Sequence, residues 1–442
     1  MNTEEKKAFN IQFWRFMWAS ILIALSACLG SIVDAMLVGS LINADSVSAI
    51  NLSFPFLQFM FTVNMLLATG AGMLVGMQIG KKDRQGASNI FTVSMAACLV
   101  AGLVISACGL FFPDGSTRLL CSNEVLFEPT KAYLQIMMIS APILLMVWAL
   151  DTMVSVDGSP RLVSVSILVD NAVHIVLDIV FISYFGWGIE GSAWAAVIGH
   201  VVGIAMMAFH FFSANNNLRL TLSSKGKELF STLKDIISQG APLAVASICL
   251  TLMLFSSNHI ILSSLGRSGI FAFSLCMNQL LIYNLFLTGV CRTIQSLGSI
   301  QVGKGDNETF TLVLRKSFNF ITVAMVITSI VVWTWPEAIV MLFGADEPDL
   351  IADACYALRI FALSSIPFCY IYAIMIVYKL CNYHQIALFI SFALSLTVIP
   401  VLWLVSQFAL DFIWYSFLMA YAIEIAAIII LHNKYKVKFE LK

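Results

Sequence analysis

The chain has 442 residues, of which 60% are hydrophobic and only 11% are charged. Soluble domains carry roughly 25% charged residues, so this composition excludes a soluble enzyme or a soluble binding domain. The formal net charge of −1 argues against nucleic acid as a partner. A lipid bilayer is therefore the expected solvent.

Twelve stretches are apolar enough and long enough to cross a bilayer, which takes roughly 20 residues per helix. The first six are predicted at residues 15–38, 47–77, 88–112, 132–156, 162–185 and 190–212. The other six are predicted at residues 238–263, 269–300, 312–335, 352–378, 385–407 and 411–432. Because none shows the alternation of barrel strands, we expect an all-α polytopic membrane protein.

Basic residues indicate how the predicted spans are oriented. An even number of spans places both termini on one side, and with the termini inside, 19 of the 24 Lys and Arg residues fall in cytoplasmic segments or at the cytoplasmic ends of the predicted spans. Only Arg118, Lys131 and Arg267 fall outside. Since cytoplasmic loops are enriched in Lys and Arg, we expect a multi-pass protein of the cytoplasmic (inner) membrane with both termini in the cytoplasm.

A short polar signature, Gln-x-Gly-Lys-x-Asp, occurs at residues 78–83 and again at residues 301–306, an offset of 223. The same offset relates Pro113 to Pro336. The chain is therefore predicted to contain two copies of one six-helix unit.

The duplication suggests a domain organisation. We predict an N-terminal lobe at residues 1–212, a cytoplasmic linker at residues 213–237 and a C-terminal lobe at residues 238–442. Many secondary transporters are duplicated in this way, and in them one half moves against the other around a central site.

The first predicted span contains an aspartate, Asp34. An ionisable side chain inside a span is costly, so it is a functional hypothesis by default. A carboxylate that faces a cavity can alternate between a charged form and a protonated or sodium-paired form. The alternative is a carboxylate that hydroxyl groups satisfy, or one near the outer surface. We predict that Asp34 is an ion-coupling residue.

The fifth predicted span holds the densest polar cluster, formed by Asp170, Asn171, His174 and Asp178. Spacings of three, four and seven place all four residues on one face of a helix. Two carboxylates, an imidazole and an amide on one face inside a membrane suit a proton relay. In the alternative interpretation, Asp170 is solvated near the cytoplasmic end and His174 donates to a backbone carbonyl.

The second half differs chemically from the first. Asn258 stands within one residue of the position that matches Asp34, so an amide replaces the carboxylate and ion coupling is predicted to reside in the first lobe. Polar residues near it and in the eighth span are candidates to line a substrate cavity, although they could equally bond neighbouring helices. These candidates are Asn258, His259, Asn278, Gln279, Tyr283 and Asn284.

Small residues at steps of four predict close helix packing. Gly72, Gly76 and Gly80 have this spacing in the second span, and Gly199 and Gly203 have it in the sixth. Such spacing lets helix backbones approach closely.

Motifs for cofactors and metals are missing from the sequence. The ten cysteines include no Cys-x-x-Cys pair, so we expect neither a zinc site nor a disulfide framework. There is no Gly-x-x-x-x-Gly-Lys-Ser/Thr segment for ATP. We therefore expect no cofactor, and an ion gradient as the source of energy.

Several segments match one known pattern. They are Val33-Asp34 to Gly39, Gln78 to Lys81, Asp157-Gly158-Ser159-Pro160-Arg161 through Asn171 to Leu177-Asp178 and Ile182, Gly191 to Ala193, and Leu342 to Glu347. In these segments, and over nearly all twelve spans, the sequence resembles the multidrug and toxic compound extrusion (MATE) family.

The resemblance implies an antiporter with two six-helix lobes. Members export organic, often cationic, compounds against an inward flow of protons or sodium. Carried over residue by residue, the resemblance places Asp34, Asn171 and Asp178 in the ion and substrate cavity of the first lobe. Sodium is a possible occupant of that cavity.

Three departures from the family pattern bear on the coupling ion. Ala19 replaces a frequent proline, His174 stands where asparagine is usual, and Ala196 stands where threonine is common. An imidazole can accept a proton, and the missing hydroxyl removes an oxygen that sodium would favour. These departures favour proton coupling over sodium coupling.

The sequence thus predicts a cation-coupled antiporter that works by alternating access, binds a small molecule and H⁺ or Na⁺ within the bilayer, and acts as a monomer. One alternative is a lipid-linked oligosaccharide flippase, which would need cavity arginines such as Arg292 or Arg359. The other is an intramembrane enzyme that uses His174 and Asp178 as base and acid. The duplication and the missing nucleophile argue against an enzyme.

Overall fold

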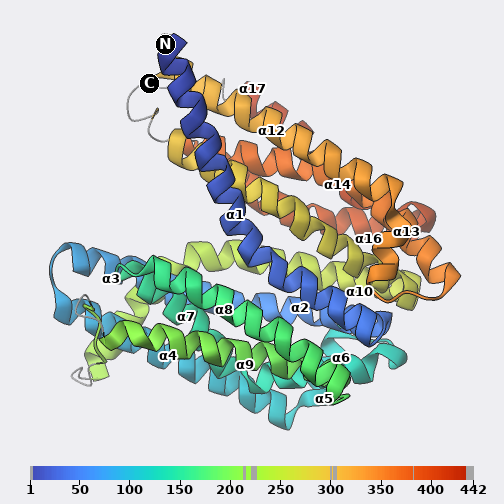
Figure 1. Ribbon diagram of the computed structural model, residues 1–442, viewed down its shortest axis with the longest axis horizontal. Coiled ribbons are helices and arrows are strands. Elements are labelled where there is room, and N and C mark those ends of the chain that lie inside the picture. The colour runs from blue at the N-terminus through green and yellow to red at the C-terminus, as the bar shows by residue number, and fades with distance from the viewer. Residues whose placement is uncertain are drawn as a thin grey trace. The chain divides into compact units, whose positions relative to one another are not determined.

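A computed structural model describes residues 3–212, 216–220, 226–298, 301, 306–381 and 383–434. All regular secondary structure in these residues is helical (Figure 1). The chain packs into two compact units, Met36–His259 and a second one formed by Met1–Ala35 with Ile260–Lys442.

The unit Met36–His259 contains the last part of the first helix, α1 (Thr3–Leu41), and the first part of α10 (Gly226–Thr293). Between them lie α2 (Ala44–Asn64), α3 (Gly70–Gly80), α4 (Arg84–Phe111), α5 (Pro113–Leu120), α6 (Glu124–Ile139), α7 (Ala141–Val156), α8 (Pro160–Asp178) and α9 (Gly188–Ala208). Two π-helical segments, Met65–Thr69 and Ile179–Tyr184, follow α2 and α8 directly.

The other unit contains most of α1 and the remainder of α10. Its further helices are α12 (Asn307–Thr334), α13 (Pro336–Leu342), α14 (Pro348–Leu380), α15 (His384–Leu396), α16 (Val398–Phe408) and α17 (Ser416–Lys434).

The predicted spans can be found in these helices. Among the described residues, nine helices are long and apolar enough to cross a membrane, or ten if α6 and α7, bent by 57° at their junction, form one span. One of the nine, Ser247–Thr293, covers two predicted spans, which Gly266 separates with a non-helical backbone (φ 66°, ψ −146°). With α1, all twelve predicted spans are accounted for, and the all-α polytopic fold is confirmed.

The duplication is visible in the local backbone. Asp83 (φ −89°, ψ 83°) and Asp306 (φ −88°, ψ 88°) have nearly the same conformation and cap α4 and α12. Asp83 accepts a hydrogen bond from the Gly86 amide at 2.9 Å, and Asp306 accepts one from the Thr309 amide at 3.0 Å. Hydrogen bonds from Thr309 also lower the pKa of Asp306. The last residue of the repeated signature is therefore a helix N-cap, which satisfies a free amide at the start of a span.

The boundaries of the predicted lobes do not coincide with those of the compact units. The units divide α1 after Ala35 and α10 after His259. α10 also begins at Gly226, within the predicted linker 213–237. The compact units are defined by contacts between residues, whereas the predicted lobes are defined by the repeat in the sequence. The division into lobes at 212 and 238 therefore stays a prediction.

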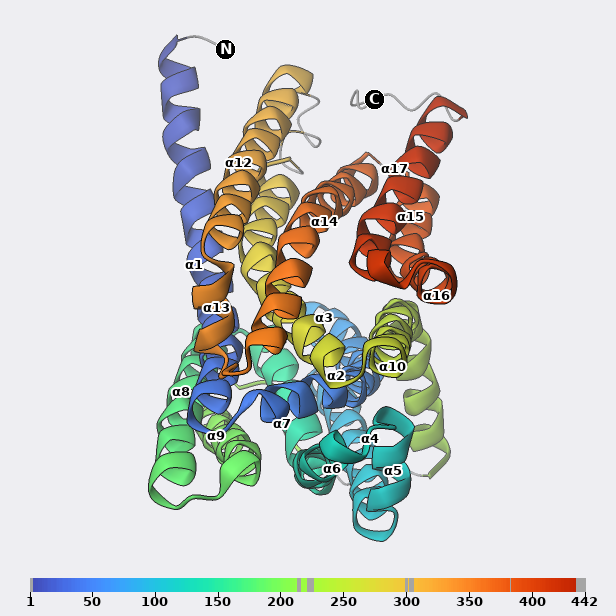
Figure 2. The same cartoon turned by 90° about the vertical axis from the view of Figure 1, so that its right-hand side faces the viewer.

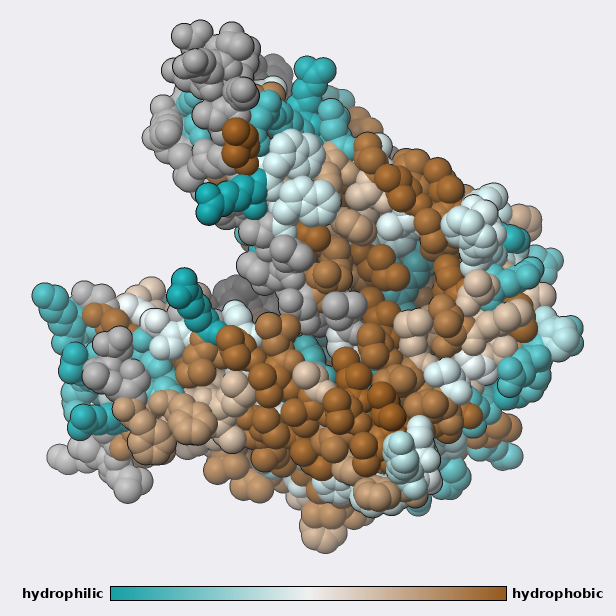
Figure 3. Space-filling view, in the orientation of Figure 1, coloured by the Kyte–Doolittle hydropathy of each residue, from teal (hydrophilic) through white to brown (hydrophobic). Residues whose placement is uncertain are grey.

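The outer surface is largely apolar. Figure 3 shows hydrophobic side chains covering wide areas of the visible face. On α4, for example, Val100 and Val104 are each 60% exposed. An apolar surface of this extent is unfavourable in water and favourable against lipid chains.

Two glycines bring α10 against the π-helical segment Met65–Thr69 and α3. A side-chain carbon added at Gly240 would lie 2.1 Å from the carbonyl oxygen of Leu66, and one added at Gly70 would lie 2.5 Å from that of Ile236. Gly72 and Gly76 of the second predicted span face α7 instead. At Gly76 an added carbon would lie 3.5 Å from the nearest atom, in Val156, which is an ordinary contact.

We predict that Gly240→Ala destabilises the protein by about 1–3 kcal/mol, because a backbone atom blocks the added carbon and the helices must move apart. The control variant Gly76→Ala should stay within about 1 kcal/mol of the unchanged protein, since alanine also favours the helix. Thermal unfolding in detergent measures both variants. Equal unfolding midpoints would contradict the close packing at Gly240.

Candidate ion-coupling and substrate site

The helix α8 presents its polar side chains along one face, as predicted. Its other face is apolar and exposed, with Val165 48% and Val176 58% accessible. Asp178 is the last residue of α8 and is completely buried. His174 lies one turn earlier, with its Nε2 3.5 Å from Oδ2 of Asp178. The imidazole and the carboxylate therefore form a buried pair inside a predicted span.

Asp34 and Asn171 are the other residues predicted to share this cavity. Asp34 is 9% exposed and belongs to α1, in the unit formed by Met1–Ala35 with Ile260–Lys442. Its place beside His174 and Asp178 stays a prediction. Asn171 lies half-buried on α8, three residues before His174. A carboxylate buried in an apolar interior is stable as an anion only with a proton or another cation beside it.

Asp170 belongs to a different contact. Its Oδ2 lies 2.7 Å from Nδ1 of His200 in α9. A carbon added at Gly199 would lie 2.4 Å from Oδ1 of Asp170, so the missing side chain of Gly199 makes room for the carboxylate. Asp170 is only 9% exposed, which disfavours the alternative of a solvated carboxylate. α8 and α9 run side by side here (Figure 2).

A further carboxylate, Asp151, lies on α7, which packs against both α8 and α9. Its Oδ1 is buried without a hydrogen-bond partner among the described residues. Asp151 and His200 were not singled out in the sequence analysis. The rule that an ionisable residue inside a span is a functional candidate would have found both, since they lie within the predicted spans 132–156 and 190–212.

A second buried histidine–aspartate pair lies at the turn between α7 and α8. Nε2 of His210 is 2.8 Å from Oδ2 of Asp157, and Asn217 donates its backbone amide and its side-chain amide to the same carboxylate, each at 2.9 Å. Gly158 follows with φ +94°. Asp157 thus ties the segment after α9 to this turn, which accounts structurally for the first part of the Asp157–Arg161 segment.

The polar residue predicted to replace Asp34 in the second half has a packing partner. Nδ2 of Asn258 donates to the backbone oxygen of Asn51 at 3.0 Å, and its Oδ1 accepts from Nδ2 of Asn51 at 3.1 Å. Asn258 is 2% exposed. This reciprocal pair links α10 to α2. His259, the next residue, is exposed.

The remaining substrate candidates lie in α10. Asn278 donates to the backbone oxygen of Ser274 at 2.9 Å, and Nε2 of Gln279 lies 3.3 Å from the Tyr283 hydroxyl. That hydroxyl is 3.0 Å from Oγ of Ser329 in α12. The first two bonds lie within α10, whereas the bond between Tyr283 and Ser329 links α10 to α12 and favours a packing role for Tyr283. Asn284 is half-buried. Substrate contact by any of these residues stays a prediction.

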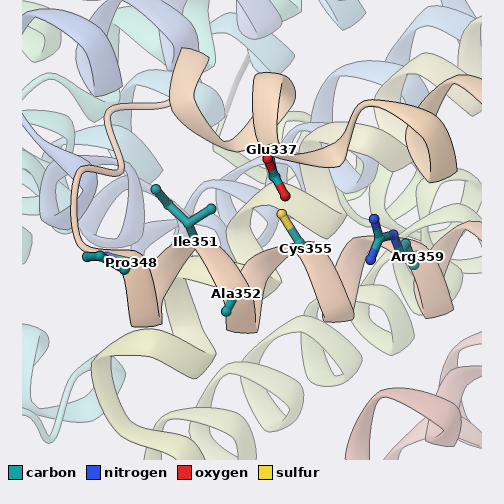
Figure 4. Close-up of a pocket in the computed structure, with 6 residues that line it drawn as sticks. All are labelled: Glu337, Pro348, Ile351, Ala352, Cys355 and Arg359. Carbon is teal, nitrogen blue, oxygen red and sulfur yellow. The ribbon is translucent and has the colours of Figure 1, made fainter.

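One open pocket lies in the unit that contains α13 and α14, with a volume of about 440 Å³. Figure 4 shows Glu337 pointing towards Cys355, with Arg359 one turn further along α14. The lining residues are Glu337, Pro348, Ile351, Ala352, Cys355 and Arg359. Arg359 thus lines a pocket beside the connection between the predicted spans 312–335 and 352–378.

The architecture is that of a polytopic membrane protein. The MatE family model matches the chain at residues 19–180 and again at residues 242–404. The two matches begin at the offset found for the repeated signature, as expected for two copies of one unit. The chain belongs to the MatE family, the multidrug and toxic compound extrusion transporters.

Curated relatives agree with this assignment. The multidrug export protein MepA of Staphylococcus aureus (strain MSSA476) is 23% identical over 362 residues, covering 80% of this chain and 78% of the relative. The MepA protein of Staphylococcus saprophyticus is 21% identical over 358 residues, with the same coverage of 80% and 78%.

Solved structures share the fold. A structure of the inward-facing conformation of a multidrug resistance MATE family transporter of the MOP superfamily has a TM-score of 0.83 and 17% identity, covering 94% of this chain and 98% of the other. An outward-facing counterpart has a TM-score of 0.68 and 17% identity, with coverage of 96% and 94%. A MOP superfamily transporter from Pyrococcus furiosus has a TM-score of 0.70 and 18% identity, with coverage of 96% and 94%. The fold is that of twelve transmembrane helices in two six-helix lobes.

We predict that the pair formed by Asn51 and Asn258 is energetically coupled. Replacing either one with alanine leaves a buried amide unsatisfied, and the double variant should lose less stability than the two single variants together, by about 0.6–1.7 kcal/mol. Unfolding of the three variants in detergent measures the coupling. If the effects simply add and only Asn258→Ala weakens transport, Asn258 is a substrate residue instead.

Proposed function

We propose that this transporter is a proton-coupled antiporter that exports organic compounds, cationic or amphipathic in character, across the cytoplasmic membrane. The buried Asp178 with His174 beside it carries the proposal, because a carboxylate and an imidazole with atoms 3.5 Å apart can share one proton. We propose that Asp34 completes this site. We further propose that the protein acts as a monomer without enzymatic activity and that both termini are cytoplasmic, in line with the distribution of Lys and Arg.

The composition of the site favours a proton over sodium. Sodium, like other hard cations, prefers a shell of oxygen ligands, whereas an imidazole readily binds a proton in the physiological range. His174 supplies a nitrogen where the family usually has an amide. Ala196 in α9 supplies no hydroxyl where threonine is common.

The charges of the site suggest a transport cycle. A proton that enters from outside neutralises one carboxylate, which lowers the cost of burying the acidic pair and weakens its attraction for a cationic substrate. The substrate leaves outwards, the two halves rearrange, and the proton is released inside as new substrate binds. A potential of 100 mV supplies about 2.3 kcal/mol for each proton that enters.

The substrate class is inferred from the acidic site and from the relatives. Buried carboxylates attract organic cations, and the 20 Met and 33 Phe residues of the chain can supply adaptable apolar contacts. The MepA proteins are named as multidrug exporters. A flippase for a lipid-linked pyrophosphate would instead need basic residues, and Arg292 is exposed on α10.

We predict that Asp178→Asn and Asp34→Asn each lower efflux of a cationic dye by at least about tenfold, because the amide cannot exchange a proton. The control variant Glu190→Gln removes an exposed carboxylate in the first turn of α9 and should leave efflux unchanged. Dye efflux from cells, normalised to the amount of protein in the membrane, measures all three variants. Normal efflux by either aspartate variant would remove that residue from the mechanism.

We predict that purified protein in liposomes transports ethidium in response to a pH gradient and not to a sodium gradient. His174→Asn combined with Ala196→Thr restores the residues that are usual in the family. This double variant should lose pH-driven transport by about tenfold or more and gain a response to sodium. Sodium-driven transport by the unchanged protein would refute proton coupling, and chemical change of the dye would favour the enzyme alternative.

A further inference from the structure

The titratable residues of the unit Met36–His259 extend beyond the group at Asp178. Along α8, Asp178, His174 and Asp170 stand roughly 27, 21 and 15 Å from the start of the helix at Pro160, at ~1.5 Å per residue. Pro160 follows the predicted cytoplasmic loop. The group at Asp178 therefore lies in the outer part of the predicted span, far from the cytoplasm into which an antiporter must release its protons.

Two further groups continue the series on neighbouring helices. His200 lies roughly 12 Å before the end of α9 at Ala208, and Asp151 lies roughly 8 Å before the end of α7 at Val156, at the same rise per residue. Both helix ends are predicted to be cytoplasmic. The two residues are thus nearer the inner face than His174 and Asp178 are.

The positions of these residues suit proton transfer. Nδ1 of His200 is 2.7 Å from Oδ2 of Asp170, a hydrogen-bonding distance. Oδ1 of Asp151 is buried without a hydrogen-bond partner among the described residues, and Asp151 belongs to α7, which packs against both α8 and α9. An imidazole can accept a proton on one nitrogen and release one from the other, so His200 can pass a proton from one carboxylate to the next.

The packing holds the Asp170 carboxylate against α9. Gly199 leaves space for Oδ1 of Asp170, and a carbon added there would also lie 2.9 Å from the backbone oxygen of Asp170. One turn earlier on α8, Oγ of Ser166 donates to the backbone oxygen of Gly203 at 2.9 Å. The two helices are therefore fixed at the height of the Asp170–His200 pair.

We propose that Asp170, His200 and Asp151 form the inner half of a proton pathway that carries the proton from His174 and Asp178 to the cytoplasmic face. The inference rests on the proposed proton-coupled function. His174 is four residues from both Asp178 and Asp170, so its ring can serve each in turn.

The transfer steps balance in protons. The His174 imidazolium loses its N–H proton as an O–H bond forms on Asp170, directly or through one water molecule. Asp170 then gives this proton to Nδ1 of His200. His200 loses a proton from Nε2 as Asp151 gains one, and Asp151 releases it to cytoplasmic water. No electron changes place, and His174 and the carboxylates return to their initial states. His200 is left as the Nδ1–H tautomer, and exchange of protons with water, which its partly exposed side chain can reach, restores the Nε2–H tautomer.

The test uses the full-length protein in liposomes with ethidium as the probe and a pH-sensitive dye trapped inside. One assay follows exchange of ethidium across the membrane without a pH gradient, which needs no release of protons. The other follows ethidium transport driven by a pH gradient together with the accompanying proton flux. The variants are His200→Gln, Asp151→Asn and Asp151→Glu, and the control is Glu190→Gln.

We expect His200→Gln and Asp151→Asn to lower pH-driven transport and proton flux by about tenfold or more, while exchange stays within about twofold. Asp151→Glu, which keeps a carboxylate, should recover much of the loss, and Glu190→Gln should behave as the unchanged protein. If the residues served only to stabilise the fold, the variants would lose exchange and pH-driven transport together.

Two results would overturn the pathway while leaving proton coupling intact. In one, His200→Gln and Asp151→Asn keep both activities. In the other, they lose exchange and pH-driven transport to the same extent. If the unchanged protein does not respond to the pH gradient, the proposal of proton coupling is wrong. This measurement on the unchanged protein precedes the comparison of variants, so it tests the proposed function separately from the pathway.

Discussion

The cost of holding charge in a medium of low dielectric constant is the constraint on which this protein depends. Asp178 is completely buried, and Nε2 of His174 lies 3.5 Å from its Oδ2. A buried carboxylate is stable as an anion only when a cation balances its charge. The same constraint explains why the lipid-facing side of α8 carries valine while its other face carries aspartate, asparagine and histidine.

The helices that hold these groups are packed through small residues and reciprocal polar contacts rather than through large apolar side chains alone. Gly199 admits the Asp170 carboxylate, and Gly240 admits the backbone at Leu66. Asn51 and Asn258 satisfy each other between α2 and α10. In lipid, where apolar contact gives little preference for one helix over another, close approach and hydrogen bonding decide which helices associate. Positions that the sequence suggested for substrate can therefore serve to align helices.

The repeated signature has a structural purpose in both copies. Its polar residues indicated the duplication because they stand out in an apolar chain. In the structure, Asp83 and Asp306 begin two long helices by capping a free amide, with nearly identical backbone angles. His174 and Asp178 are not repeated, because Thr397 and Val401 stand at the matching offset of 223. Duplication thus preserved the scaffold while its chemistry diverged, since Asn258 replaces the carboxylate of the first half.

The sequence by itself determined the class of protein, the twelve spans, the duplication and the shared face of Asp170, Asn171, His174 and Asp178. These follow from composition and from the helical period, which act over a few residues. Only the tertiary structure decided that His200 lies against Asp170, 30 residues away, and Asn258 against Asn51, 207 residues away. Helical periodicity tells which residues share a face but not which helix that face meets, because long-range packing selects the partner.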